Sequence, residues 1–221
     1  MRISPRAGAL VLAGLSTVVI AGPAGGAVRV SGAPSPAADV RESLVELGLP
    51  VPTGQTLARE VQRLGAAADR ARTPRFPVAG PFNWGQDGAR YGASRSGHVH
   101  EGQDVFARTG TALVAVSDGV VVETGNDGGR GNYVAIHDPD AGRTYVYLHM
   151  AGPSLAGTGE RVQAGSRVGA VGCTGSCFGD HLHFEIRRGR GTTGPSVDPL
   201  PHLQQWAAEH GARDTLPPGQ S

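Results

Sequence analysis

Three short stretches of the chain hold the residue types that bind metal ions and move protons. They read HVHEGQD (98–104), TYVYLHM (144–150) and HLHFEIR (181–187). Catalytic zinc takes three nitrogen, oxygen or sulfur ligands from the protein and keeps a fourth position open. The three stretches together supply five candidates, which are His100, Asp104, His149, His181 and His183. This count predicts a catalytic zinc site with two histidines left over to act on water and substrate.

Each stretch is weak when taken alone. In HLHFEIR the alternation predicts a strand with one apolar face and one polar face. The apolar face consists of Leu182, Phe184 and Ile186, and the polar face of His181, His183 and Glu185. Two histidines two residues apart on a strand stand about 6.5 Å apart. That spacing suits one metal ligand beside a polar neighbour better than two ligands of one ion.

The stretch HVHEGQD requires a bend if it is to bind metal. On a straight strand His100 and Asp104 would be about 13 Å apart, which is too far for one ion. We expect Gly102 to permit the bend between them. The alternatives are an ordinary polar turn, or His98 in place of His100 as the ligand.

The middle stretch is the least informative. Alternation places Tyr145, Tyr147 and His149 on one face of a strand, and Val146 and Leu148 on the other. An exposed strand surface would give the same pattern.

The elements around these stretches are short strands joined by turns. Three strand pairs are predicted, each separated by a turn or loop: 111–116 with 120–124, 132–137 with 143–149, and 168–172 with 181–187. Short helices are expected at 39–48 and 57–64, and a final helix at 201–211 precedes a frayed tail. The fold class predicted is therefore mainly β, an antiparallel β-sheet domain with short N-terminal helices and a C-terminal helix.

The predicted organisation has five parts. Residues 1–27 carry two arginines, a short apolar run and small residues, which is the pattern of a secretory signal peptide, with an uncleaved anchor as the alternative. A linker follows at 28–38 and a helical accessory segment at 39–76, either a spacer or a cover for the site. The main domain spans 77–205, and 206–221 hold the end of the helix and the tail.

Charge indicates no nucleic-acid partner. All 20 basic residues are arginines, scattered along a chain of net charge +1. Removing residues 1–27 takes away two arginines and no acid, so the mature charge becomes +1 − 2 = −1. We expect a secreted, extracellular or wall-associated monomer with no stable membrane insertion.

The order of the motifs resembles a known family. HEGQD, then YLH, then HLHFE is similar to the lysostaphin/LytM-type zinc endopeptidases of bacterial cell walls, whose pattern runs H-x-x-x-D, Y-x-H, H-x-H. The resemblance implies that His100, Asp104 and His183 bind Zn²⁺ and that His149 and His181 flank the metal-bound water. It gives Tyr147 an outer or substrate-contacting role, and peptidoglycan as the substrate. Arg95 is a candidate for substrate carboxylates.

Some relatives lack zinc ligands and activate wall amidases, so a non-catalytic wall-binding protein or amidase activator is the alternative function. The only two cysteines, Cys173 and Cys177, precede His181 and His183 at a spacing unlike that of zinc fingers. Export favours a short disulfide there. A structural zinc module built on these cysteines is the third reading. The remaining histidines, His137, His202 and His210, are expected to be solvated.

Overall fold

The computed structural model describes residues 73–217 continuously and, before them, residues 11–14, 17–21, 27–31, 55, 59, 62 and 63. The chain forms two compact units, Met1–Ala71 and Arg72–Ser221. In the first unit, β1 (Val11–Gly14), β2 (Thr17–Ala21) and β3 (Ala27–Ser31) make an antiparallel sheet. The first two strands lie in the predicted signal peptide, and β3 takes in the start of the predicted linker.

The helices expected at 39–48 and 57–64 lie outside the described residues, except that positions 59, 62 and 63 are helical. Within the described part of the chain, no helix has the length and apolar character needed to cross a membrane.

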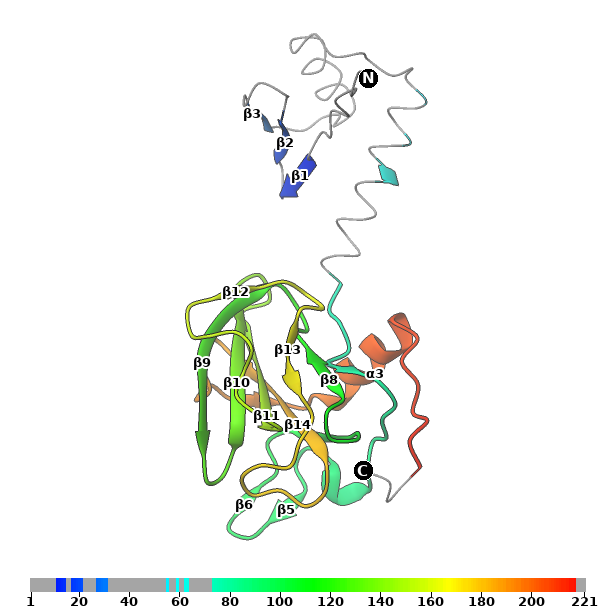
Figure 1. Cartoon of the computed structure of the whole chain (residues 1–221), viewed down its shortest axis with the longest axis vertical. Coiled ribbons are helices and arrows are strands. Elements are labelled where there is room, and N and C mark those ends of the chain that lie inside the picture. Colours follow the sequence, from blue (N-terminus) through cyan, green and yellow to red (C-terminus); the bar gives the residue numbers. More distant parts are fainter. Residues whose placement is uncertain are drawn as a thin grey trace, which may run out of the picture. The chain divides into compact units, whose positions relative to one another are not determined.

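The second unit is built on a seven-stranded sheet (Figure 1). Its strands run in the order β12-β9-β10-β11-β14-β15, and β7 also pairs with β14. All pairings are antiparallel. The bounds are β7 Gln103–Phe106, β9 Gly119–Asp127, β10 Gly131–Asp138, β11 Arg143–Met150, β12 Arg161–Val162, β14 His181–Arg188 and β15 Ser196–Val197. The predicted hairpin over 132–149 is confirmed as β10 and β11.

A second sheet has the order β13-β8-β4, with β4 Val78–Ala79, β8 Ala112–Val114 and β13 Arg167–Ala170. A two-stranded ribbon joins β5 (Ser94–Arg95) to β6 (His98–Val99), after the 3₁₀ turn η1 (Asp87–Ala89). Among residues 73–217 the single α-helix is α3 (Leu200–Glu209), which confirms the expected C-terminal helix. The predicted class, mainly antiparallel β with a C-terminal helix, is confirmed for this unit.

Two of the three predicted strand pairs are wrong. β8 pairs with β13 and β4, whereas β9 pairs with β10 and β12, so residues 111–124 turn a corner between two sheets. Asp118 accepts a hydrogen bond from the Ala164 N–H, and a Cβ on Gly119 would lie 2.6 Å from the His137 carbonyl. Asp118 therefore holds the corner between the two sheets, and Gly119 allows the backbone to approach the His137 carbonyl closely. Likewise, 168–172 meets β14 only through a bridge between Gly172 and His181.

The main core lies between the two sheets and α3. It includes Leu113, Val168, Tyr147, Phe184 and Trp206. Leu182, Phe184 and Ile186 are fully buried, as the alternation predicts. A smaller apolar cluster on the other side of the main sheet is formed by Tyr133, Ala135, Val146 and Leu148.

The expected frayed tail is wrong over its first part. Trp206 and Ala207 belong to the main core, beyond the predicted domain end at 205. Leu216 is buried, and its N–H donates to the Phe82 carbonyl, which also accepts from Thr215. Because these backbone groups are paired and an apolar side chain is covered, the chain is held to the domain as far as residue 216.

Candidate metal centre and active site

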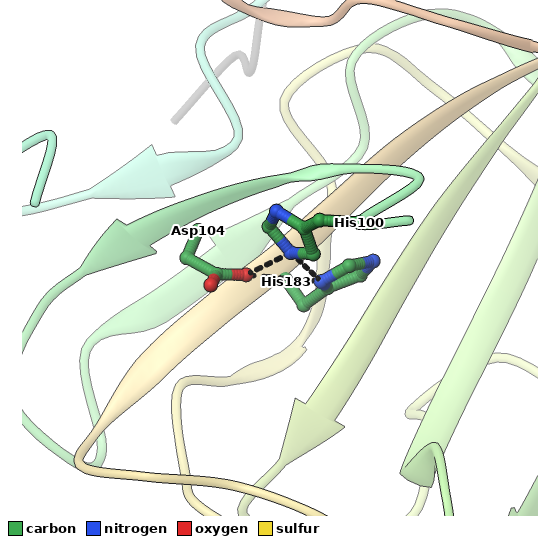
Figure 2. Close-up of side chains that lie close together, drawn as sticks. All are labelled: His100, Asp104 and His183. Atoms are coloured by element: carbon green, nitrogen blue, oxygen red, sulfur yellow. Dashed lines mark hydrogen bonds and ion pairs between the residues drawn. The ribbon is translucent and has the colours of Figure 1, made fainter. Parts of the chain in front are cut away.

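Three side chains from two strands and a loop converge on one point (Figure 2). His100 Nε2 lies 3.0 Å from Asp104 Oδ1 and 2.9 Å from His183 Nδ1, and His183 Nδ1 lies 2.9 Å from Asp104 Oδ1. All three residues are buried. Asp104 lies on β7 directly opposite His183 on β14, so the sheet register itself brings the aspartate to the histidine. Their closeness makes His100, Asp104 and His183 a group able to hold a metal ion.

Hydrogen bonds on the far side of each ring fix which nitrogen faces the centre. His100 donates from Nδ1 to the Arg90 carbonyl at 2.8 Å, and His183 donates from Nε2 to Glu185 at 3.1 Å. Both acceptors have no proton to give, so His100 Nε2 and the neutral form of His183 Nδ1 carry lone pairs toward Asp104. Outer partners of this kind are typical of metal-binding histidines.

These donors fit Zn²⁺. Two imidazole lone pairs and a carboxylate, all buried within about 3 Å of one another, repel unless a cation lies among them. Without metal a proton takes that role: burial opposes the charge, but Asp104 and Glu185 raise the pKa of His183 to about 9. Burial also opposes ionisation of Asp104, yet the neighbouring His100 and the protonated His183 hold its pKa well below the usual range.

Gly102 lies at a bend directly before β7, as expected, and it is also needed for space. A Cβ at this position would lie 2.5 Å from His183 Nε2 and 2.6 Å from the Phe184 carbonyl. Its φ lies outside the positive range, so the bend itself does not require a left-handed backbone. The His183 ring packs directly against the backbone where a side chain would be.

His149 reaches the site through a β-bulge. The register between β10 and β11 shifts between Asn132 and Val134, which places an extra residue on β11. His149 has φ +62°, and it is the only non-glycine residue with positive φ in the described part of the chain. A bulge re-aims the side chain that it carries. The ring centroid of His149 lies 5.0 Å from that of His181 and 5.9 Å from that of His183.

The expected common face of Tyr145, Tyr147 and His149 is therefore wrong. Both tyrosines point into the main core, and the bulge turns His149 to the opposite side. Tyr147 is fully buried, and its hydroxyl donates to the Val114 carbonyl and accepts from the Val116 N–H. The structure does not bring this side chain to the metal centre, and full burial excludes the expected substrate contact.

His149 and His181 share one hydrogen-bonding pattern. Each donates from Nδ1 at 2.8 Å to a backbone carbonyl, that of Thr174 for His149 and that of Gly179 for His181. Nε2 is thus the nitrogen with the lone pair, and for His181 it lies 3.6 Å from Asp104 Oδ1. Burial, reinforced by the neighbouring His181, lowers the pKa of His149 to about 4, and burial lowers the pKa of His181. Both rings are neutral near pH 7 and able to accept a proton.

An open groove of about 900 Å³ runs over these residues. The residues that line it include most of the β5–β6 ribbon and, from other parts of the chain, Gly129, Arg130, Ser176 and Phe178. Arg95 on the ribbon contacts the metal group, with its guanidinium 3.2 Å from Asp104 Oδ2. Two large apolar side chains stand exposed on the walls, Val99 at 57% and Phe178 at 92%.

His98 also lines the groove but is exposed and lies outside the group of three ligands. The other histidines are not simply solvated as expected. His137, His202 and His210 are each half-buried, and each has a hydrogen-bond partner.

Sequence reasoning missed that Glu185 supports His183 and that further ion pairs extend from Glu185. Glu185 connects His183 to Arg187 Nε at 2.7 Å, and Arg187 continues to Glu101 at 2.8 Å. The sequence spacing could have indicated this, because His183, Glu185 and Arg187 follow one another at intervals of two residues and so share one face of the strand.

Cys173 and Cys177 form a disulfide, as expected, with Cα atoms 5.3 Å apart. Because these are the only cysteines of the chain, no thiolate is left for a structural zinc module.

Known proteins have sequences similar to this part of the chain. Residues 98–199 match the family described as Peptidase family M23. The glycyl-glycine endopeptidase ALE-1 of Staphylococcus capitis is 34% identical over 54% of this chain and 33% of its own length. The peptidoglycan DD-endopeptidase ShyA of Vibrio cholerae is 44% identical over 41% of this chain and 21% of its own. The chain thus spans a third or less of these two relatives.

Among solved structures, the antimicrobial peptidase lysostaphin of Staphylococcus simulans is 27% identical with a TM-score of 0.52. That match covers 65% of this chain and 60% of the other. The sequence match, the antiparallel fold and the three converging side chains together identify residues 98–199 as a domain of Peptidase family M23.

Proposed function

We propose that this protein is an exported zinc endopeptidase that hydrolyses peptide bonds of peptidoglycan. The observation that carries the proposal is the buried His100, Asp104 and His183 group beneath an open groove, with two neutral histidines beside it. The names of the relatives support peptidoglycan peptides as the substrate class. Those names specify different bonds, so the proposal covers the class and not one bond.

The residues of the chain have distinct tasks in this reaction. Zinc held by such ligands polarises a carbonyl and makes water acidic enough to attack near neutral pH. His149 and His181 offer Nε2 as the proton acceptor, since Nδ1 is committed to the backbone. Once protonated, Nε2 becomes a donor toward the oxyanion of the substrate. Arg95, at the rim, offers its guanidinium to substrate carboxylates.

Export and monomeric action complete the proposal. The arginines, apolar run and small residues of 1–27 support a signal peptide, and a disulfide beside the site suits a compartment outside the cytosol. All five site residues come from one chain, so activity needs no second copy.

The test is metal analysis together with digestion of purified peptidoglycan. We expect one zinc per chain and the release of new amino termini, abolished by a chelator and restored by zinc. His183→Ala should lose both zinc and hydrolysis. Binding to sacculi without new amino termini would instead support the wall-binding or amidase-activator function. Mass spectrometry of products from defined muropeptides then names the bond that is cut.

A further inference from the structure

One loop holds both histidines that flank the metal centre. The Thr174 carbonyl accepts from His149 Nδ1, and the Gly179 carbonyl accepts from His181 Nδ1, each at 2.8 Å. The disulfide joins Cys173, directly before Thr174, to Cys177, which lies two residues before Gly179. The tautomer and the ring orientation of both histidines therefore depend on the loop 173–179.

The metal ligands do not depend on this loop. His100 is oriented by the carbonyl of Arg90, and His183 by the carboxylate of Glu185. Asp104 lies on β7 and is placed by its pairing with β14. The groups that hold the metal ligands in place are therefore different from the loop that orients the two flanking histidines.

The loop touches residues 129–131 through the Gly175 backbone and through the Ser176 N–H, which donates to the Gly129 carbonyl at 3.0 Å, but it has few buried side chains. Cys173, Gly175, Ser176 and Gly179 are exposed, and the Phe178 side chain is 92% exposed. A segment with few buried apolar contacts opens easily unless hydrogen bonds or cross-links restrain it. The cross-link here is also in contact with the site, since Cys177 Sγ lies 3.7 Å from His181 Nδ1 and 2.9 Å from the Gly179 carbonyl oxygen.

The two ends of the loop are restrained differently. The Thr174 hydroxyl donates to the Met150 carbonyl at 2.8 Å and accepts from the Asn132 N–H at 2.9 Å. This end is therefore attached to β10 and β11 without help from the disulfide. Gly179 lies between Cys177 and Asp180, and the Asp180 carboxylate accepts from the Thr109 N–H at 3.1 Å. The position of the Gly179 carbonyl is therefore set by the cross-linked sulfur on one side and by this contact on the other.

We propose that the loop 173–179 is a positioning device for catalysis, in which the Cys173–Cys177 disulfide fixes the Gly179 carbonyl that orients His181. The Thr174 hydroxyl does the same for the carbonyl that orients His149. This inference rests on the proposed function for its catalytic consequence, but the ring orientations are measurable without activity.

The experiment compares the full-length wild type with Cys173→Ala/Cys177→Ala and with Thr174→Val. In the double variant we expect kcat to fall about 10- to 100-fold, the range found when outer partners of a site are lost. KM should stay within twofold, and zinc content at one per chain. The NMR signal of the His181 Nδ1–H should broaden or vanish while that of His149 remains. In Thr174→Val the Nδ1–H signal of His149 should broaden or vanish, while that of His181 remains.

Reduction of the folded wild type with a phosphine should reproduce the effect of the double variant. The double variant is its matched control: it has no disulfide to reduce, so the phosphine should leave it unchanged. It also has no thiol that could compete for zinc.

An unchanged kcat and an unchanged His181 signal, in the folded double variant or in the reduced wild type, would overturn the inference. A zinc content that falls with kcat would overturn it as well, because the loop would then support the ligands. If the wild type itself hydrolyses no peptidoglycan, the proposed function fails, and the two NMR signals still decide the positioning.

Discussion

Glu185→Gln tests whether a residue that touches no metal controls metal affinity. The Glu185 carboxylate uses one oxygen for His183 Nε2 at 3.1 Å and the other for Arg187 Nε at 2.7 Å, and the residue is only 8% exposed. Glutamine has nearly the same size but a single oxygen. It can accept from one of these two donors, and its NH₂ group then faces the other.

The magnitude follows from that mismatch. Hydrogen bonds to charged groups contribute about 1.5–3 kcal/mol, and loss of an outer partner of a metal ligand lowers affinity about 10- to 100-fold. The second range corresponds to about 1.4–2.7 kcal/mol, so the two agree. We therefore expect the zinc Kd of Glu185→Gln to rise about 10- to 100-fold, together with a lower pKa for His183, because burial is then opposed by one carboxylate fewer.

The assay is competition for zinc against a chromophoric chelator at constant pH. Glu101→Gln is the matched control, because Glu101 accepts from the same Arg187 at 2.8 Å but has a side chain that is 48% exposed. An exposed pair contributes at most about 1 kcal/mol, so its zinc Kd should stay within about fivefold. The reasoning is refuted if folded Glu185→Gln keeps the wild-type Kd, or if Glu101→Gln weakens zinc binding as strongly.

Three further substitutions separate space, core packing and ligation. Gly102→Ala places a Cβ 2.5 Å from His183 Nε2. We expect chemical denaturation to show a loss of about 1–3 kcal/mol in stability, and we expect the purified variant to contain less zinc. A normal zinc content would contradict the close packing of His183 against Gly102. Tyr147→Phe leaves two backbone groups without their partner; it should cost about 1–3 kcal/mol in denaturation while kcat of the folded enzyme is unchanged. A zinc concentration of 100 times Kd should stabilise the wild type by about 2.7 kcal/mol, seen as a rise in Tm. Asp104→Asn should abolish that rise, and its persistence would remove Asp104 from the ligands.

The sequence by itself determined the features that depend on short-range periodicity. Alternation assigned Leu182, Phe184 and Ile186 to the core and His181 and His183 to the other face, because successive residues of a strand point in opposite directions. The β10–β11 hairpin, the C-terminal helix and the disulfide are local in the same sense. The order and type of the three motifs were enough to indicate the family and to select three side chains that converge in the structure.

Only the tertiary structure decided which strands pair and where His149 points. Asp118 and Gly119 look like a hairpin turn, but their partners are a distant N–H and a distant carbonyl, so the chain changes sheets there. His149 breaks the alternation because one extra residue on β11 has no counterpart on β10, and a bulge follows from pairing between strands. The carbonyls that orient His149 and His181 are equally invisible in the sequence, since every residue has a carbonyl and only the fold selects Thr174 and Gly179.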